Sequence, residues 1–260
     1  MTTITLGDGQ NNASKNGIDR PLDSLNFFLA DVRDGLGPYL AIYLLSVQKW
    51  DELSIGLVMT VGGIAGIVAQ TPVGALIDNS KHKKALIIFA AIAVTICSIA
   101  LPWLTSFQAV ALSQIITGAA GSIFQPALAA ITLGLVGPKM FAKRNGRNEA
   151  FNHAGNAFAA ALAGIFAWEF GPIAVFYLMA AMAVASILSM MAVPFNRVDH
   201  QLARGLHEDA SEVEDKVSGF RVLITCRPLL IFSLCVVLFH FANAAMLPLV
   251  GQKLALANPS

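Results

Sequence analysis

The stretch that decides the fold is residues 173–194, IAVFYLMAAMAVASILSMMAVP, which carries no charged side chain. A membrane-spanning α-helix needs about 20 consecutive apolar residues to cross the hydrocarbon core of a bilayer. The whole chain shares this character, because 56% of its 260 residues are hydrophobic and only 13% are charged. An ordinary soluble domain is about 25% charged. The composition therefore predicts an all-α polytopic membrane protein.

The charge balance and the motifs exclude several other classes. Lys plus Arg number 17 and Asp plus Glu 16, a net charge of +1, which is unlike a basic nucleic-acid-binding protein. The three cysteines are scattered and form neither a disulfide framework nor a zinc motif. No phosphate-binding loop, HExxH or GxSxG motif is present in the sequence. We therefore expect no enzyme, no cofactor, no metal site and no nucleic-acid partner.

Six more stretches are long and apolar enough to be candidate spans. The first is the weakest, because it carries Asp31, Arg33 and Asp34. With the stretch quoted above as the sixth, the predicted spans cover residues 25–47, 55–77, 85–104, 110–136, 150–170, 173–194 and 229–250.

Basic residues alternate between the two sides of these spans. They gather in the amino-terminal tail and after the second, fourth and sixth predicted spans, whereas the other side carries Lys49 and Lys253. Lys and Arg are retained in the cytoplasm, so we expect a cytoplasmic amino terminus. The predicted organisation is a cytoplasmic tail (1–24), a six-helix transmembrane bundle (25–195), a cytoplasmic linker (196–228) and a seventh span that starts an incomplete second half (229–260).

The predicted linker is polar and mixed in charge. Its acidic residues are interpreted as a solvated face, and the spacing of His200 and His207 fits no metal motif. The acidic residues are Glu208, Asp209, Glu212, Glu214 and Asp215.

The connection after the second predicted span carries a recognisable pattern, residues 74–84, GALIDNSKHKK. It resembles the loop signature of the major facilitator superfamily, usually written GxLaDrxGrrk, and it departs from that pattern at Asn79 and at residues 80–82. The alternative is a generic basic cytoplasmic loop. The matching positions that we take as the signature are Gly74, Leu76, Asp78, Lys81, Lys83 and Lys84.

Other features are similar to the same family. Six spans, a long linker and one more span resemble the first half of a twelve-span member plus one helix. Residues 113–121 resemble its RxxxG segment with Gln114 in place of the Arg, whereas the antiporter pattern of the fifth helix is missing, which argues against drug–proton antiport. Residues 26–38 and 240–252 resemble a group of bacterial members. The resemblance implies a multi-pass inner-membrane transporter that moves a small solute by alternating access, driven by a proton gradient.

Ionisable residues inside a span are costly and are therefore candidates for function. Asp31 and Asp34 lie three residues apart and share one helix face, with Arg33 about 100° from Asp34. A carboxylate here either takes up and releases a proton during transport, or forms an ion pair with Arg33 that holds the first helix in place. The sequence leaves both interpretations open.

Further candidates lie on the fourth, fifth and seventh predicted spans. Gln114, Gly118, Gly121 and Gln125 form one stripe, which is interpreted as a helix contact or as the lining of a substrate path. His153 is a candidate for a gate or for proton transfer. In the resembled family the seventh helix lines the central cavity, which implies a role there for His240 and Asn243.

The expected partners are the lipid bilayer and an unknown small solute, and a second-half chain or another copy of this chain is also considered. The alternative function is a truncated or split product without transport activity of its own; a membrane receptor or enzyme is a third class. We expect the Gly62–Gly66 face and the face with Asn152 and Asn156 to meet lipid in the chain alone. We therefore expect no saturable flux from it.

Overall fold

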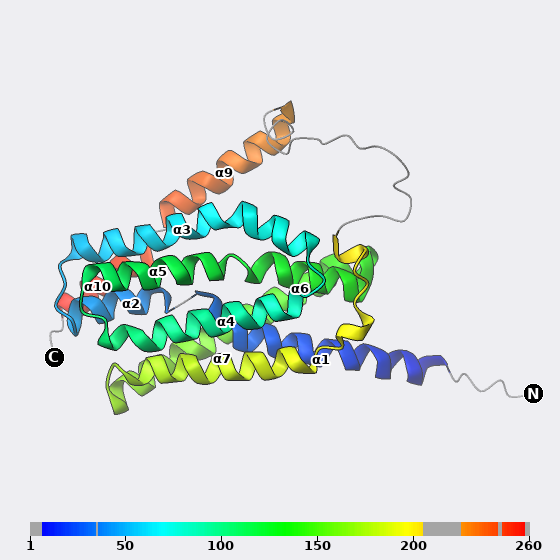
Figure 1. Ribbon diagram of the computed structural model, residues 1–260, viewed down its shortest axis with the longest axis horizontal. Coiled ribbons are helices and arrows are strands. Elements are labelled where there is room, and N and C mark those ends of the chain that lie inside the picture. The colour runs from blue at the N-terminus through cyan, green and yellow to red at the C-terminus, as the bar shows by residue number, and fades with distance from the viewer. Residues whose placement is uncertain (1–6, 35, 205–224, 244–245, 258–260) are drawn as a thin grey trace, which may run out of the picture. The chain divides into compact units, whose positions relative to one another are not determined.

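A computed structural model describes residues 7–34, 36–204, 225–243 and 246–257 (Figure 1). All the regular elements among these residues are helices, which confirms the predicted all-α fold. The chain divides into two compact units, Met1–Leu36 with Glu52–Leu206, and Gly37–Asp51 with His207–Ser260. The acidic cluster of the predicted linker lies outside the described residues.

The first unit is a bundle of long helices. Helix α3 packs against α5, α1 packs against α6 and α7, and α4 packs against α5 and α7. Its elements are α1 (Gly7–Asp34), α3 (Glu52–Asn79), α4 (Lys83–Ala100), η1 (Leu101–Trp103), α5 (Phe107–Gly121), α6 (Phe124–Phe170), α7 (Ala174–Ala192), η2 (Phe195–Arg197) and η3 (Leu202–Arg204).

The second unit contains α2 (Gly37–Ser46), α9 (Arg227–Asn243) and α10 (Met246–Ala257). Helix α10 packs closely on α2 at Gly251, because a Cβ atom on this glycine would lie 2.9 Å from Cδ1 of Ile42. The seventh span, predicted over 229–250, is covered here by two helices. Helix α9 has 17 residues, about 25 Å of helix, which is shorter than a hydrocarbon core of about 30 Å.

The first predicted span is also divided, because α1 ends at Asp34 and α2 begins at Gly37. A proline ring clashes with the carbonyl group four residues earlier, and for Pro38 that residue is Asp34. Leu36 between the helices has a positive φ of 68°. At its other end α1 begins at Gly7, well before residue 25. Part of this extension is packed, because Leu22 is fully buried like Leu25 one turn later.

The fourth and fifth predicted spans meet at a sharp turn inside α6. Gly137 has φ 71° and ψ 169°, and helix continues on both sides of it. A positive φ favours glycine, and Pro138 suits the first turn of the next helix. Helix α5 and the first part of α6 therefore form the fourth predicted span, and the rest of α6 contains the fifth. The connection between the fourth and fifth predicted spans was expected to be a loop up to residue 149, whereas it is helical from Pro138 onward.

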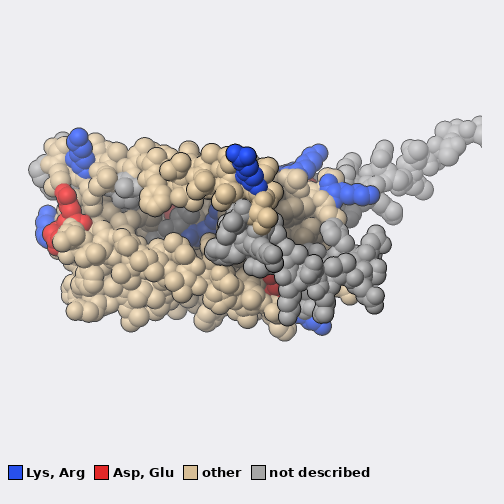
Figure 2. Space-filling model, turned by 90° about the horizontal axis from the view of Figure 1, so that it is seen from above, with Lys and Arg blue, Asp and Glu red and all other residues tan. Residues whose placement is uncertain are grey.

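Among the described residues, four helical stretches are long and apolar enough to cross a membrane: Glu52–Asn79, Lys83–Trp103, Phe107–Phe170 and Ala174–Ala192. They overlap the second to sixth predicted spans, and the first and seventh stay predictions. Large apolar side chains point outward, as lipid contact requires: Ile64, Ile67 and Val68 on α3 are 55%, 70% and 68% exposed. The face drawn in Figure 2 consists mainly of uncharged residues.

Glycines let α3 and α5 approach closely. A Cβ on Gly66 would lie 3.2 Å from the carbonyl oxygen of Gly118, and a Cβ on Gly118 would overlap the carbonyl oxygen of Gly62. The expectation that the Gly62–Gly66 face meets lipid is therefore wrong, because α5 of the same unit covers it. Small residues at helix interfaces allow this kind of contact in membranes.

The face of α6 that carries Asn152 is covered as well. Asn152 is 5% exposed, and a Cβ on Gly155 would overlap the carbonyl oxygen of Phe27 on α1. Asn156 is half-buried. Helix α1 thus covers the face that was expected to meet lipid. The expected absence of saturable flux from the chain alone also rested on the lack of a second bundle, and it stays a prediction.

We predict that Gly118→Ala destabilises the first unit, because the new methyl group overlaps the backbone of α3. Overpacking of this kind typically costs about 1–3 kcal/mol, so the unfolding temperature of the purified protein in detergent should fall. Gly63→Ala is the matched control, since a Cβ on Gly63 meets nothing within 4 Å. The free energy of unfolding of that variant should equal that of the wild type or exceed it by about 0.5–1 kcal/mol. Equal unfolding temperatures for both variants would contradict the proposed contact.

Candidate functional site

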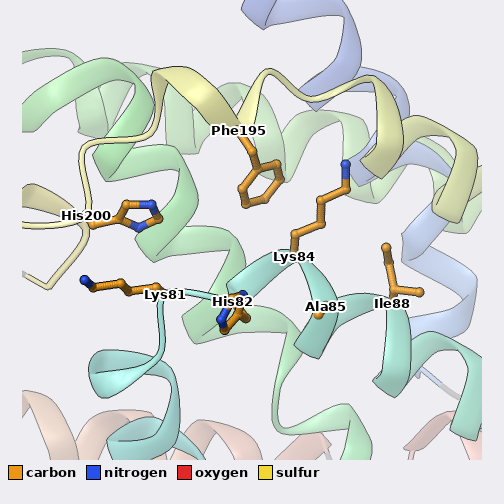
Figure 3. Close-up of a pocket in the computed structure, with 7 residues that line it drawn as sticks. All are labelled: Lys81, His82, Lys84, Ala85, Ile88, Phe195 and His200. Atoms are coloured by element: carbon orange, nitrogen blue, oxygen red, sulfur yellow. The ribbon is translucent and has the colours of Figure 1, made fainter.

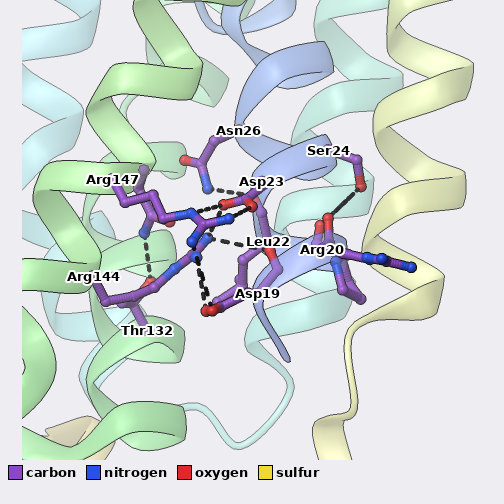
Figure 4. A network of polar contacts seen from close by, with 11 residues as sticks. Asp19, Arg20, Leu22, Asp23, Ser24, Asn26, Thr132, Arg144 and Arg147 are labelled. Atoms are coloured by element: carbon purple, nitrogen blue, oxygen red, sulfur yellow. Dashed lines mark hydrogen bonds and ion pairs between the residues drawn. The ribbon is translucent and has the colours of Figure 1, made fainter. Parts of the chain in front are cut away.

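A cluster of four charged side chains joins α1 to α6 (Figure 4). Arg144 donates from Nη1 to Asp19 Oδ1 at 2.9 Å and from Nη2 to Asp23 Oδ1 at 2.7 Å. Arg147 donates from Nε to Asp23 Oδ1 at 3.0 Å and from Nη2 to Asp23 Oδ2. The Arg144 and Asp23 side chains are 4% and 9% exposed. Two carboxylates thus balance two guanidinium groups; Arg144 and Asp23 are buried, whereas Arg147 and Asp19 are 49% and 31% exposed.

This cluster was not predicted from the sequence. The two Asp residues were expected in a tail and the two Arg residues in a loop, whereas both segments are helical here. The available signal was spacing, since Asp19 and Asp23 are four residues apart and Arg144 and Arg147 are three apart. Each pair therefore shares one helix face. The pairing of these two faces was not visible from spacing alone.

Ten residues further along α1, half-buried Arg33 meets Gln125, an exposed residue at the start of α6. With its amide oriented to suit the guanidinium group, the Gln125 oxygen accepts hydrogen bonds from Nη1 of Arg33, at 3.1 Å, and from Nη2. Gly121 lies beside them, since a Cβ on it would be 3.8 Å from the Arg33 carbonyl oxygen. The break between α5 and α6 is therefore placed against the end of α1.

The depth of this contact follows from helix geometry. Arg33 lies ten residues beyond Asp23 on α1, and each residue of an α-helix adds about 1.5 Å, so the separation is about 15 Å. That distance is half of a hydrocarbon core of about 30 Å. If the charged cluster marks the membrane boundary, Arg33 and Gln125 lie near its middle. Asp31 is half-buried on the same helix, and the side chain of Asp34 lies outside the described residues.

The stripe predicted on the fourth span serves two different contacts. Gln114 is 9% exposed, and its Cβ would lie 3.1 Å from a Cβ on Gly62 of α3. Gln114 and Gly118 therefore belong to the helix contact with α3, whereas Gly121 and Gln125 are near Arg33. Of the two interpretations of this stripe, helix packing describes the first pair, and the lining of a substrate path by the second pair stays a prediction.

The loop signature lies between α3 and α4. Asp78 and Lys81 are exposed, whereas Lys83 is 1% exposed and donates from Nζ to the carbonyl oxygen of Ser80 at 2.8 Å. Lys84 donates to the carbonyl oxygen of Met191 at 3.5 Å. A Cβ on Gly74 would meet nothing within 4 Å, so this glycine makes no close helix contact among the described residues. The basic residues of the signature therefore point in different directions.

Comparison with known proteins identifies the family. The model of the Major Facilitator Superfamily matches residues 23–257. The chain belongs to this superfamily. Two proteins from two strains of Mycobacterium tuberculosis, each named an uncharacterized MFS-type transporter, are 56% identical to it over 241 residues. The aligned region is 93% of this chain and 58% of each relative, so the chain spans less than two thirds of their length.

These findings confirm the resemblance drawn from the loop signature, and the major facilitator family is one of transporters rather than of enzymes. The remaining candidates are His153, His240 and Asn243. His153 on α6 is exposed. In the second unit, Nδ1 of His240 is 2.8 Å from the carbonyl oxygen of Val236, and Asn243 donates to that of Phe239 at 2.8 Å. Both side chains bind their own helix and are exposed, so their cavity role stays a prediction.

We predict that Asp23→Asn strongly destabilises the protein, because it leaves Arg144 and Arg147 without their shared charge partner. Breaking a buried ion pair from one side typically costs about 3–5 kcal/mol, so the unfolding temperature in detergent should fall markedly. Glu169→Gln, which removes an exposed carboxylate from the same unit, is the control and should have little effect. Similar unfolding temperatures for the two variants would show that the cluster does not hold α1 on α6.

Proposed function

We propose that the chain serves secondary active transport of a small solute across the bacterial inner membrane, by alternating access and with the proton as coupling ion. The M. tuberculosis relatives are named as uncharacterized MFS-type transporters. The observation that supports the proposal best is the contact of Arg33 with Gln125, with half-buried Asp31 on the same helix. Ionisable groups at membrane depth are costly and usually mark substrate or proton pathways.

The proposed mechanism gives these residues separate tasks. Arg33 is a fixed cation, and its guanidinium group is oriented by the Gln125 oxygen. Asp31 is the group that exchanges a proton, and Asp34 is a second candidate for this step. A protonated carboxyl group carries no charge, so it is less costly to move through an apolar environment than a carboxylate. Uptake and release of one proton would therefore change which of two bundle arrangements is favoured.

The location of the site fits alternating access. In secondary transporters the substrate and the coupling ion bind near the middle of the bilayer, and access changes by rocking of one bundle against another. The first unit places polar groups about 15 Å from the charged cluster. The alternative that the chain has no transport activity by itself is addressed by the same experiment as the main proposal.

We predict that Asp31→Asn abolishes proton-coupled transport. The assay uses two proteins: the chain itself, and a chimera in which it replaces the matching segment of the M. tuberculosis relative. Each is reconstituted into vesicles that contain a pH-sensitive dye, and sugars, amino acids and organic cations are added in turn. Saturable, solute-dependent proton movement should be lost in Asp31→Asn and kept in Glu169→Gln.

The outcomes separate the alternatives. Flux from the chimera but not from the chain would favour a product that needs a second-half chain. Unchanged coupled flux in Asp31→Asn, Asp34→Asn and the double variant would remove both carboxylates from the mechanism. Absence of saturable flux from both proteins with every solute, at verified orientation and folding, would count against the transport proposal.

We also predict that the connection between α3 and α4 is cytoplasmic, as the distribution of Lys and Arg indicates. In a variant without native cysteines, Lys81→Cys should resist a membrane-impermeant thiol reagent in intact cells and react after the membrane is opened. Thr105→Cys, exposed in the connection at the other end of α4, should react in intact cells. The reverse labelling pattern would overturn the proposed orientation and the cytoplasmic amino terminus.

A further inference from the structure

A basic cavity lies beside the loop signature (Figure 3). It has a volume of about 430 Å³, and four basic side chains line it: Lys81, His82, Lys84 and His200. Lys81 and His82 lie in the connection between α3 and α4, Lys84 lies in the first turn of α4, and His200 follows η2. No lining residue is acidic. The described part of the chain therefore gathers basic side chains from two distant segments around one space.

The two segments are fixed to each other and to the bundle. Besides its hydrogen bond to Met191, the Lys84 ammonium group lies 5.3 Å from the centroid of the Phe195 ring. The backbone N–H of Asp199 donates to the carbonyl oxygen of Gly134 at 2.9 Å. The Asp199 carboxylate accepts from the backbone N–H groups of Gln201 and Leu202, at 2.8 and 3.1 Å. The nearest acidic neighbour of His200 in sequence is thus bound to backbone and does not line the cavity.

His200 supplies a second, independent observation. Its Nδ1 atom is buried and makes no hydrogen bond to another atom of the described chain. Figure 3 shows the His200 ring directed into the space between Phe195 and His82. Buried polar atoms are nearly always hydrogen-bonded. An anionic oxygen in the cavity would balance the lysines, and a rotation of the imidazole ring would bring this nitrogen into contact with it.

The apolar side of the cavity continues along the membrane-exposed face of α4. Ala85 and Ile88 line the cavity with Phe195. Further along α4, Phe89, Ile92 and Ile96 are 68%, 43% and 62% exposed. Their spacing places all three on one helix face with Ala85. A cationic cavity thus opens onto an apolar stripe that faces the lipid chains.

We propose that this cavity binds the phosphate headgroup of an anionic phospholipid, whose acyl chain lies along the α4 stripe. The lysines and His200 recognise the phosphate, and Ile88, Phe89 and Ile92 contact the chain. Basic pockets at the cytoplasmic ends of membrane helices bind such headgroups. A free phosphate compound would satisfy the cations equally well, but it would leave the continuous apolar stripe unused. The phospholipid is therefore the occupant that fits both parts of the site.

The test measures lipid binding to the purified full chain in a neutral detergent, by native mass spectrometry. Three probes are compared: phosphatidylglycerol, phosphatidylcholine with the same acyl chains, and glycerol 3-phosphate. Phosphatidylglycerol should bind at least tenfold more tightly than either of the others. The Lys81→Gln/Lys84→Gln variant should lose roughly 30-fold in phosphatidylglycerol affinity, equivalent to about 1 kcal/mol for each cation. His200→Leu should weaken binding to a smaller extent.

Controls keep the result interpretable. Lys139→Gln removes an exposed cation that does not line the cavity, and its affinity should equal that of the wild type. Lys84 also contacts Met191, so its replacement could disturb the fold. The second variant is therefore Lys81→Gln/His82→Gln, which changes two exposed residues. Its unfolding temperature checks that it folds. Equal affinity of this variant and Lys139→Gln for phosphatidylglycerol would overturn the proposal. Equal binding of phosphatidylcholine would overturn it too, and tight binding of glycerol 3-phosphate would identify a free phosphate compound as the occupant.

Discussion

The structure of the first unit depends on the buried ion pairs between α1 and α6. A buried carboxylate and guanidinium group are stable only together, because either charge alone is costly in a low-dielectric environment. Asp23 and Arg144 therefore fix the position of α1 along the axis of the second part of α6. Since an α-helix is rigid over this length, the position of Arg33 near Gln125 follows from that register. The ion pairs at one end thus set the geometry of polar groups about 15 Å away.

The elements that the sequence predicts well are those set by local chemistry. Apolar stretches predict the second to sixth spans, because a helix must satisfy its own backbone hydrogen bonds in lipid. Local chemistry also explains the two places where the expected boundaries shift. Pro38 prevents a continuous helix over residues 25–47, and Gly137 replaces an expected loop by a one-residue turn. Both residues were visible in the sequence, but the exact geometry of each turn depends on packing.

The candidate site was predicted less completely, because its contacts join segments far apart in the chain. Arg33 and Gln125 were both identified as candidates, but their contact with each other was not predicted, because the sequence offered only Asp31 and Asp34 as partners of Arg33. The amide partner comes from a helix that starts about 90 residues later. The charged cluster was missed for the same reason, since Arg144 and Asp23 are separated by 121 residues. Spacing shows which residues share a helix face, but it does not show which two faces meet.

The stripe on α5 and the start of α6 illustrates why one pattern can support two interpretations. At Gln114 and Gly118 the partner is the glycine face of α3, so the small size of Gly62, Gly66 and Gly118 determines how closely the two helices approach. At Gln125 the partner is a guanidinium group, so hydrogen-bonding capacity determines it. The change occurs across the break at residues 122 and 123, where α6 starts a new helix. A break in a helix therefore lets one sequence stripe pack tightly on one side of it and present a polar group to α1 on the other.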